Sequence, residues 1–142
     1  MLVAACGGST EQGREEAAAR QFRQRLAQNR TDLIYKEASE SLRSSMSEAE
    51  LRKQLAQSQV LGIAEQSDRA HYTRATISGA DTVMTYYNTR FTKGTCAESF
   101  SWRQEGEGLK LAAYSCAANM QVTCNAGASC ETSRVPLPGF AG

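Results

Sequence analysis

The sequence predicts an α+β domain in which three N-terminal helices pack on a four-stranded antiparallel sheet. Apolar residues recur at helical spacing from residue 14 to residue 62. From residue 69 to residue 114 the pattern changes to alternation, and short turns that contain glycine interrupt it. The 142 residues match the length of one domain and are enough to form a core.

The helical half is expected to contain three helices in series. Residues 14–28 are rich in good helix formers, and residues 32–44 repeat their apolar positions every four residues. Ser47 and Glu50 have the spacing of a capping box, which predicts a third helix that stops at Gly62. The expected apolar positions are Ala18, Phe22, Leu26, Ile34, Ala38, Leu42, Leu51 and Leu55.

The second half is expected to form an antiparallel meander with one apolar face covered by the helices. The expected strands are residues 69–78, 82–92, 95–104 and 109–114. Alternation places one set of residues from each of the last three strands on the same face. These sets are Val83, Thr85, Tyr87, Thr89 and Phe91; Glu98, Phe100 and Trp102; and Leu109, Leu111 and Ala113. Lys110, Ala112 and Tyr114 are then expected on the opposite face.

The cysteines are odd in number: Cys6, Cys96, Cys116, Cys124 and Cys130. An odd count in a secreted protein needs an explanation, and lipidation of Cys6 supplies one. The other four allow three connectivities, of which we predict 96–116 and 124–130, bracing a C-terminal extension of the sheet. Zinc is the competing hypothesis. The chain has no Cys-x-x-Cys pair, and the single histidine, His71, is far away in sequence, so no metal is expected.

The pairing of the last two strands gives two conflicting registers. A three-residue loop at 105–107 sets Cys96 directly opposite Cys116, whereas matching the apolar faces requires Trp102 opposite Leu111. The two registers differ by one residue, which moves every side chain to the other face. A β-bulge between Trp102 and Cys96 reconciles them, and we predict it there.

The stretch Val3-Ala4-Ala5-Cys6 resembles a bacterial lipobox, in which the cysteine becomes the acylated N-terminus. This resemblance implies a chain held by palmitate-type acyl chains on Cys6, facing the periplasm. Gly7, in place of Asp, implies the outer membrane rather than the inner one. The expected organisation is a signal remnant at 1–5, a lipid-anchor tether at 6–13, one α+β domain at 14–134 and a proline-containing tail at 135–142.

Several short segments carry a second resemblance. They are residues 35–39 (YKEAS), Leu61-Gly62 followed by Arg69, residues 85–91 (TYYNTRF), residues 98–102 (ESFSW) and residues 109–114 (LKLAAY). The chain resembles small bacterial lipoproteins of unknown function with a cystatin-like or nuclear-transport-factor-2-like cone fold. The resemblance implies a sheet curved around its first helices, and such families have no assigned catalytic residues to carry over.

Cone folds often hold a pocket between sheet and helices, and enzymes on this fold place acid–base residues there. The candidates are His71, Asp81, Tyr87, Glu98 and Tyr114, and the expected pocket is lined by Tyr87, Glu98, Trp102 and Tyr114. Glu98 either faces the pocket as a base or pairs with Arg90 or Lys110 at the sheet margin. No Ser-His-Asp or Cys-His arrangement and no glycine-rich phosphate loop is present, so neither an enzyme nor a cofactor is expected.

Composition narrows the function. A net charge of +1 argues against a nucleic-acid partner, and no apolar run is long enough to span a membrane. The leading hypothesis is a non-catalytic periplasmic lipoprotein that binds a protein partner in the cell envelope. Its sharper form is an immunity protein that neutralises a secreted antibacterial effector. The alternatives are a small-molecule-binding or enzymatic cone domain with a pocket near Glu98, and a structural or secretion-machinery lipoprotein.

Overall fold

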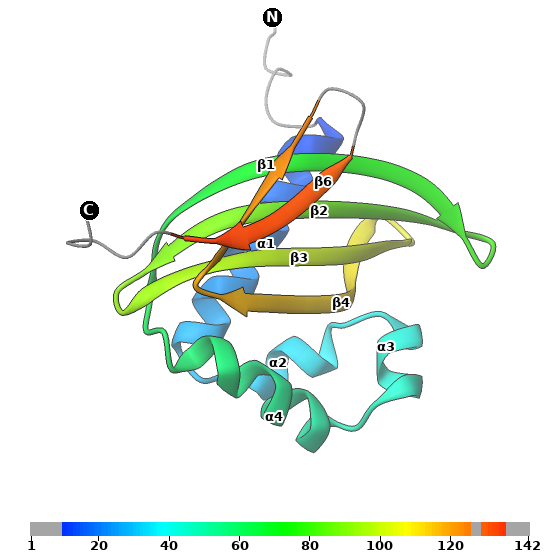
Figure 1. Ribbon diagram of the computed structural model, residues 1–142. Coiled ribbons are helices and arrows are strands. Elements are labelled where there is room, and N and C mark those ends of the chain that lie inside the picture. The colour runs from blue at the N-terminus through cyan, green and yellow to red at the C-terminus, as the bar shows by residue number, and fades with distance from the viewer. Residues whose placement is uncertain (1–9, 126–128, 136–142) are drawn as a thin grey trace, which may run out of the picture.

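A four-stranded antiparallel sheet organises the computed structural model, which describes residues 10–125 and 129–135 (Figure 1). The strands lie in sequence order, β1-β2-β3-β4. They are β1 (Ala64–Ile77), β2 (Ala80–Phe91), β3 (Gly94–Glu105) and β4 (Gly108–Ala118). The α+β class and the antiparallel meander are therefore as the alternation of the sequence predicted. Cys6 and most of the C-terminal tail lie outside the described residues.

The helices are α1 (Glu11–Ala27), α2 (Thr31–Lys36), α3 (Glu40–Ser45) and α4 (Glu48–Gln59). The expectation of a single helix over residues 32–44 was wrong, because Ser39 interrupts it. The backbone of Ser39 is extended, its side chain accepts a hydrogen bond from the Leu42 N–H, and its own N–H donates to the Leu111 carbonyl of β4 at 2.8 Å. Ser39 thus caps α3 and ties the helical layer to the sheet.

The other helix boundaries follow from local capping. Thr10 accepts a hydrogen bond from the Gly13 N–H, so α1 begins three residues before the expected Arg14 and includes residues assigned to the tether. The capping box of Ser47 and Glu50 is confirmed at the start of α4. Gly62 follows α4 with φ of +93°, and a Cβ there would lie 1.9 Å from the Thr92 hydroxyl oxygen, so only glycine fits.

The predicted bulge in the pairing of β3 with β4 is confirmed, but its extra residue lies on β4. A direct pairing of Cys96 with Cys116 required the extra residue on β3. Trp102 is opposite Leu111 and Ser101 is opposite Ala113, which leaves Ala112 as the extra residue on β4. Beyond the bulge the faces of β4 exchange. The placement of Ala113 inside and Tyr114 outside was therefore wrong: Tyr114 is buried and Ala113 is exposed.

Both predicted cysteine pairs are at bonding distance. Because the bulge adds its residue to β4, Cys116 lies opposite Glu98 and Cys96 lies opposite Ala118. The two cysteines are thus diagonal neighbours on one face, with Cα atoms 5.6 Å apart, rather than directly opposite. Cys124 and Cys130 pair directly across a small second sheet, with Cα atoms 4.0 Å apart.

This second sheet is a hairpin of β5 (Met120–Cys124) and β6 (Cys130–Arg134). It lies across the face of the main sheet that α1 does not cover (Figure 1). The Asn88 side chain holds it there, since its amide donates to the Val122 carbonyl at 2.8 Å and its oxygen accepts from the Val122 N–H at 2.7 Å.

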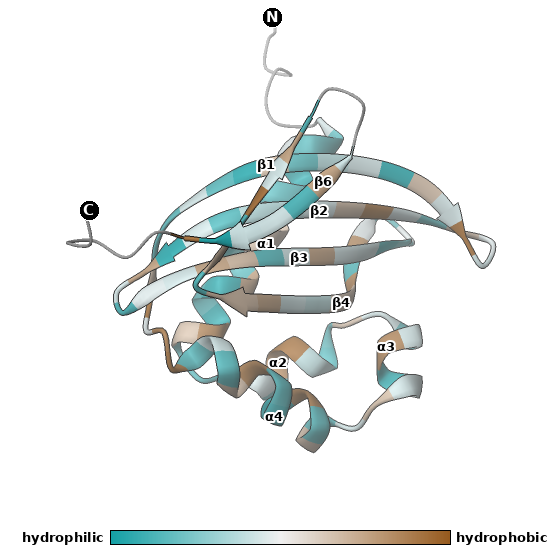
Figure 2. Cartoon of the chain, viewed as in Figure 1, coloured by the Kyte–Doolittle hydropathy of each residue, from teal (hydrophilic) through white to brown (hydrophobic). Residues whose placement is uncertain are grey.

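The main core lies between α1 and the inner face of the sheet. Phe100 is at its centre, with the Phe22 ring edge-on at 5.3 Å and the Trp102 ring stacked at 5.2 Å. By contrast, β1 is an edge strand and is largely hydrophilic along its length (Figure 2). Among residues 10–125 and 129–135, no helix has the length and apolar character needed to cross a membrane.

Candidate functional site

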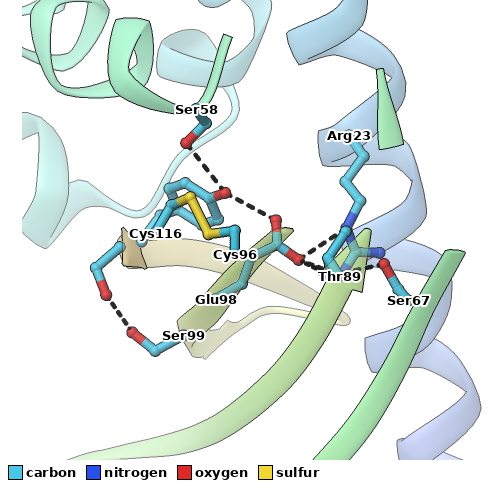
Figure 3. Close-up of a disulfide and its surroundings, with 10 residues drawn as sticks. Arg23, Ser58, Ser67, Thr89, Cys96, Glu98, Ser99 and Cys116 are labelled. Carbon is cyan, nitrogen blue, oxygen red and sulfur yellow. Dashed lines mark hydrogen bonds and ion pairs between the residues drawn. A yellow bond between two sulfur atoms is a disulfide. The ribbon is translucent and has the colours of Figure 1, made fainter. Parts of the chain in front are cut away.

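Two fully buried glutamates lie on the inner side of the sheet, and each is surrounded by donors. Glu98 lies between the Cys96–Cys116 disulfide and Arg23, which reaches it from α1 (Figure 3). The Arg23 guanidinium donates to Glu98 Oε1 from Nη2 at 2.8 Å and from Nε at 3.1 Å. The Thr89 hydroxyl donates to the same oxygen, and the Tyr114 hydroxyl donates to Oε2 at 2.7 Å.

Glu15 is the second buried glutamate, and it comes from α1 itself. Tyr87 donates to Glu15 Oε1, and the guanidinium of Arg69 lies 3.2 Å from the same oxygen. Oε2 accepts from the Thr85 hydroxyl at 2.8 Å and from the Trp102 indole N–H at 2.9 Å. Three of its four donors are therefore neutral.

Arg23 joins the two clusters. Its guanidinium binds Glu98 and also lies over the ring of Tyr87, 4.6 Å from the centroid, while the Tyr87 hydroxyl donates to Glu15. A cation over an aromatic face is stabilised by the ring quadrupole. One continuous polar network therefore crosses the core from Glu15 through Tyr87 and Arg23 to Glu98.

The tyrosines of this network remain neutral donors. Burial raises the pKa of Tyr87 well above its usual value, and the hydrogen bond to Glu15 raises it further. Burial also raises the pKa of Tyr114, and the nearby charge of Glu98 adds to that effect. Both hydroxyls accordingly keep their protons at neutral pH and hold the carboxylates by donation.

The network is closed to a substrate. All four carboxylate oxygens already accept hydrogen bonds from protein donors, and both glutamates are inaccessible to solvent. Within the part of the chain that the structure describes, the only buried side-chain polar atom without a partner is Thr31 Oγ1. The expected pocket residues Tyr87, Glu98, Trp102 and Tyr114 do come together, but they are core residues with at most 4% exposure.

An open groove lies beside this network, between α1 and the first residues of β1. Its volume is about 520 Å³, and its lining includes Arg23 and Tyr87, which bind the buried glutamates. The remaining lining residues are Glu16, Arg20, Gln24, Ala27, Ile63, Ala64, Glu65, Gln66 and Ser67. We call this feature the α1–β1 groove.

The charged groups of the α1–β1 groove differ in how far they are neutralised. Arg23 is engaged by Glu98, Glu65 lies 3.4 Å from Arg90, and Glu16 lies 3.7 Å from Arg69. Arg20 is exposed and makes no hydrogen bond or ion pair with any described residue. Among the residues that the structure describes, the groove therefore presents Arg20 as an uncompensated cation beside an edge strand.

The remaining acid–base candidates lie elsewhere. Asp81 is exposed at the start of β2 and pairs with Arg74 at 3.0 Å, and His71 is on the outer face against Tyr86. The expectation that Glu98 pairs with Arg90 or Lys110 at the sheet margin was wrong, because Arg23 binds it in the interior. These candidates thus do not assemble into one acid–base site.

Sequence reasoning missed Glu15 and its partner Arg69. Glu15 precedes Phe22 by seven residues, which is two helical turns, so it lies on the same face as the apolar stripe. A charged residue at a core position of a helix predicts a buried polar network, and that signal was available.

Comparison with known proteins adds no relative: the chain matches no family model, and no curated protein or solved structure is significantly similar to it. The site is therefore interpreted from its own geometry.

Proposed function

We propose that this protein is a non-catalytic lipoprotein of the bacterial cell envelope that binds a protein partner through the α1–β1 groove. The observation that carries the proposal is the contrast between two buried, hydrogen-bonded glutamates and an open groove beside them. Glu15 and Glu98 are inaccessible to solvent and each of their oxygens accepts a hydrogen bond from the protein, whereas the groove beside them is open and borders β1, an edge strand of the described sheet.

The groove is suited to an extended segment of a partner chain. Within the described sheet β1 is paired on one side only, so its other side offers backbone groups for an added strand. Ile63 is 59% exposed at the groove and Val60 is 69% exposed nearby, which gives an apolar contact beside the polar edge. Arg20 is placed to receive an acidic side chain of that segment.

The anchor and the cone fold belong to the same proposal. The lipobox at Cys6 supports acylation and an outer-membrane location, with the domain facing the periplasm. Because α1 begins at Glu11, the five peptide steps from Cys6 span at most about 18 Å, which holds the domain close to the bilayer. A long meander covered on one face by α1 supports the cystatin-like cone.

An immunity protein is the sharper form of the proposal, because a lipid-anchored inhibitor is held where an incoming antibacterial effector arrives. A small-molecule binder is the second candidate, and one observation favours it: the groove volume of about 520 Å³ falls within the range of ligand pockets. Glu98 is sealed beneath that groove, so in this alternative Arg20, Gln24 and Tyr87 contact the ligand rather than Glu98.

Affinity capture tests the proposal. The lipidated full-length chain is used as bait against envelope extracts and against proteins secreted by neighbouring strains. We expect one stoichiometric partner, with binding weakened by at least about tenfold in Ile63→Asp and Arg20→Glu. Lys53→Glu, exposed on α4, is the matched control and should bind normally. A secreted toxin as the partner supports immunity, and an envelope protein supports a machinery role.

The opposite result is equally clear. If no partner is captured and mass spectrometry of the purified protein finds a small molecule that Arg20→Glu releases, protein binding is rejected in favour of the ligand-binding alternative.

A further inference from the structure

We infer that the face of the sheet opposite α1 carries a zinc site made of His71, Cys124 and Cys130, which forms when the Cys124–Cys130 disulfide is reduced. A ring nitrogen of His71 and the two cysteine sulfurs all lie within 4.8 Å of one another, and all three residues are half-buried. The argument against zinc from sequence distance fails here, because the β5–β6 hairpin folds back across β1 and brings its cysteines to the histidine.

The ligand set matches zinc chemistry. Two thiolates and one imidazole with an open fourth position form a known class of zinc coordination. With Zn–S bonds of about 2.3 Å in a tetrahedron, the two sulfurs are about 3.8 Å apart. Cys124 and Cys130 are the last pair of the β5–β6 ladder, and their side chains are free to rotate apart once the disulfide opens.

His71 is already oriented for such a role. Its Nε2 is hydrogen-bonded to the Thr73 hydroxyl, and its ring stacks against Tyr86 with centroids 6.1 Å apart. A zinc-bound histidine usually has its second nitrogen held by a hydrogen-bonding group, which fixes the ring and selects the metal-binding nitrogen. With Nε2 engaged, Nδ1 is the nitrogen left for the metal.

The disulfide controls access to the site. Two equivalents of a small thiol, or one dithiol, reduce the Cys124–Cys130 bond to two cysteine thiols, and the reductant leaves as its own disulfide. One Zn²⁺ then binds, the two thiols release two protons, and His71 completes the set. The second disulfide differs in access at one of its two sulfurs, because Cys96 is fully buried, whereas Cys116, Cys124 and Cys130 are all half-buried. Limited reduction is therefore expected to open the hairpin first.

The test is metal titration of the full chain after limited reduction with a dithiol, under anaerobic conditions. Alkylation and mass mapping first establish that Cys124 and Cys130 are free. We expect the reduced protein to bind one zinc ion, to show tetrahedral cobalt absorption on Co²⁺ substitution, and to lose both properties on reoxidation. His71→Ala should weaken zinc binding by at least about tenfold, and the exposed neighbour Ser133→Ala should not.

Specific outcomes overturn the proposal. Failure of the reduced protein to bind zinc, or equal affinity in wild type and His71→Ala, excludes the three-residue site. If limited reduction also opens Cys96–Cys116, the Cys96→Ala/Cys116→Ala variant supplies the same measurement, with circular dichroism confirming its fold. Zinc bound equally by a Cys124→Ser/Cys130→Ser variant would place the metal elsewhere and reject the assignment.

Discussion

The two buried glutamates of this protein occupy similar positions but are stabilised in different ways. Both are inaccessible to solvent, and each has one arginine, one tyrosine and one threonine as donors. Glu98 receives two N–H groups from Arg23, with the shorter at 2.8 Å, whereas Glu15 receives one from Arg69 at 3.2 Å and gains the indole of Trp102. Glu98 therefore depends on a charged partner, and Glu15 depends mainly on neutral donors.

The difference matters because a buried charge is costly unless its partners compensate it. Removing Arg23 takes both charged N–H groups from Glu98 and leaves two neutral donors, while removing Arg69 takes one longer contact from Glu15 and leaves three neutral donors. The Glu98 cluster also has covalent support, since Cys116 lies opposite Glu98 on β4. The Glu15 cluster has no disulfide among the residues that surround it in the described structure.

The largest expected effect comes from truncating the two arginines. Arg23→Met should lower the free energy of unfolding by about 3–5 kcal/mol. Arg69→Met should lower it by about 1–3 kcal/mol, because Tyr87 and Trp102 still donate to Glu15. Urea denaturation measures both losses. Arg20 makes no hydrogen bond or ion pair with another described residue, so Arg20→Met should change stability by less than about 0.5 kcal/mol.

Equal losses for the two arginine variants would contradict this comparison, because they would mean that the neutral donors of Glu15 do not replace a charged partner.

The disulfide beside Glu98 gives the next largest effect. Cys96→Ala/Cys116→Ala removes a link over a sequence separation of 20 residues, and we expect a loss of about 3 kcal/mol. Combining it with Tyr114→Phe, which removes a donor to Glu98, should give a non-additive loss of more than about 0.5 kcal/mol. The combination with Tyr87→Phe, in the Glu15 cluster, should be additive. Thermal or urea unfolding of the cysteine variant, the two single tyrosine variants and the two combinations measures the coupling. Coupling of equal size to both tyrosines would mean that the disulfide supports the Glu15 end of the network as strongly as the Glu98 end.

The features of these clusters that could be predicted from the sequence are those that depend on residues close together in the chain. Strand alternation and the capping box at Ser47 involve near neighbours, and both were predicted from sequence. Glu98 was correctly placed on the face of Phe100 and Trp102 for the same reason. Its partner was not, because Arg23 lies 75 residues earlier in the chain and reaches Glu98 only through the packing of α1 on the sheet.

The errors also have nonlocal causes. The break at Ser39 depends on a hydrogen bond to Leu111 on β4, which no helical pattern contains. The bulge was placed correctly along the sheet, but residue alternation could not decide which strand carries the extra residue. Only the pairing of Ala113 with Ser101 assigns it to Ala112. The proximity of His71 to Cys124 likewise results from the hairpin crossing the sheet.

Alkaline pH tests the tyrosines of both clusters and has the smallest expected effect. The pKa of Tyr87 and the pKa of Tyr114 are raised above the ordinary value of 10 in the folded state. Above pH 10 the unfolded chain therefore loses these protons while the folded chain keeps them, so stability is complete below pH 10 and falls as pH rises. Each tyrosine contributes at most about 1.4 kcal/mol per pH unit to that fall.

Replacing either tyrosine should make the alkaline fall less steep. Tyr87→Phe and Tyr114→Phe should each reduce the slope of unfolding free energy against pH above pH 10, by an amount that approaches about 1.4 kcal/mol per unit as the unfolded tyrosine becomes fully ionised. Thr85→Val is the matched control, since it removes a donor to Glu15 that does not titrate in this range. It should lower stability at all pH values without changing the slope. Urea titrations at pH 9, 10 and 11 measure these slopes. An unchanged slope in Tyr87→Phe alone would mean that burial and the hydrogen bond to Glu15 do not raise the pKa of Tyr87 in the folded protein.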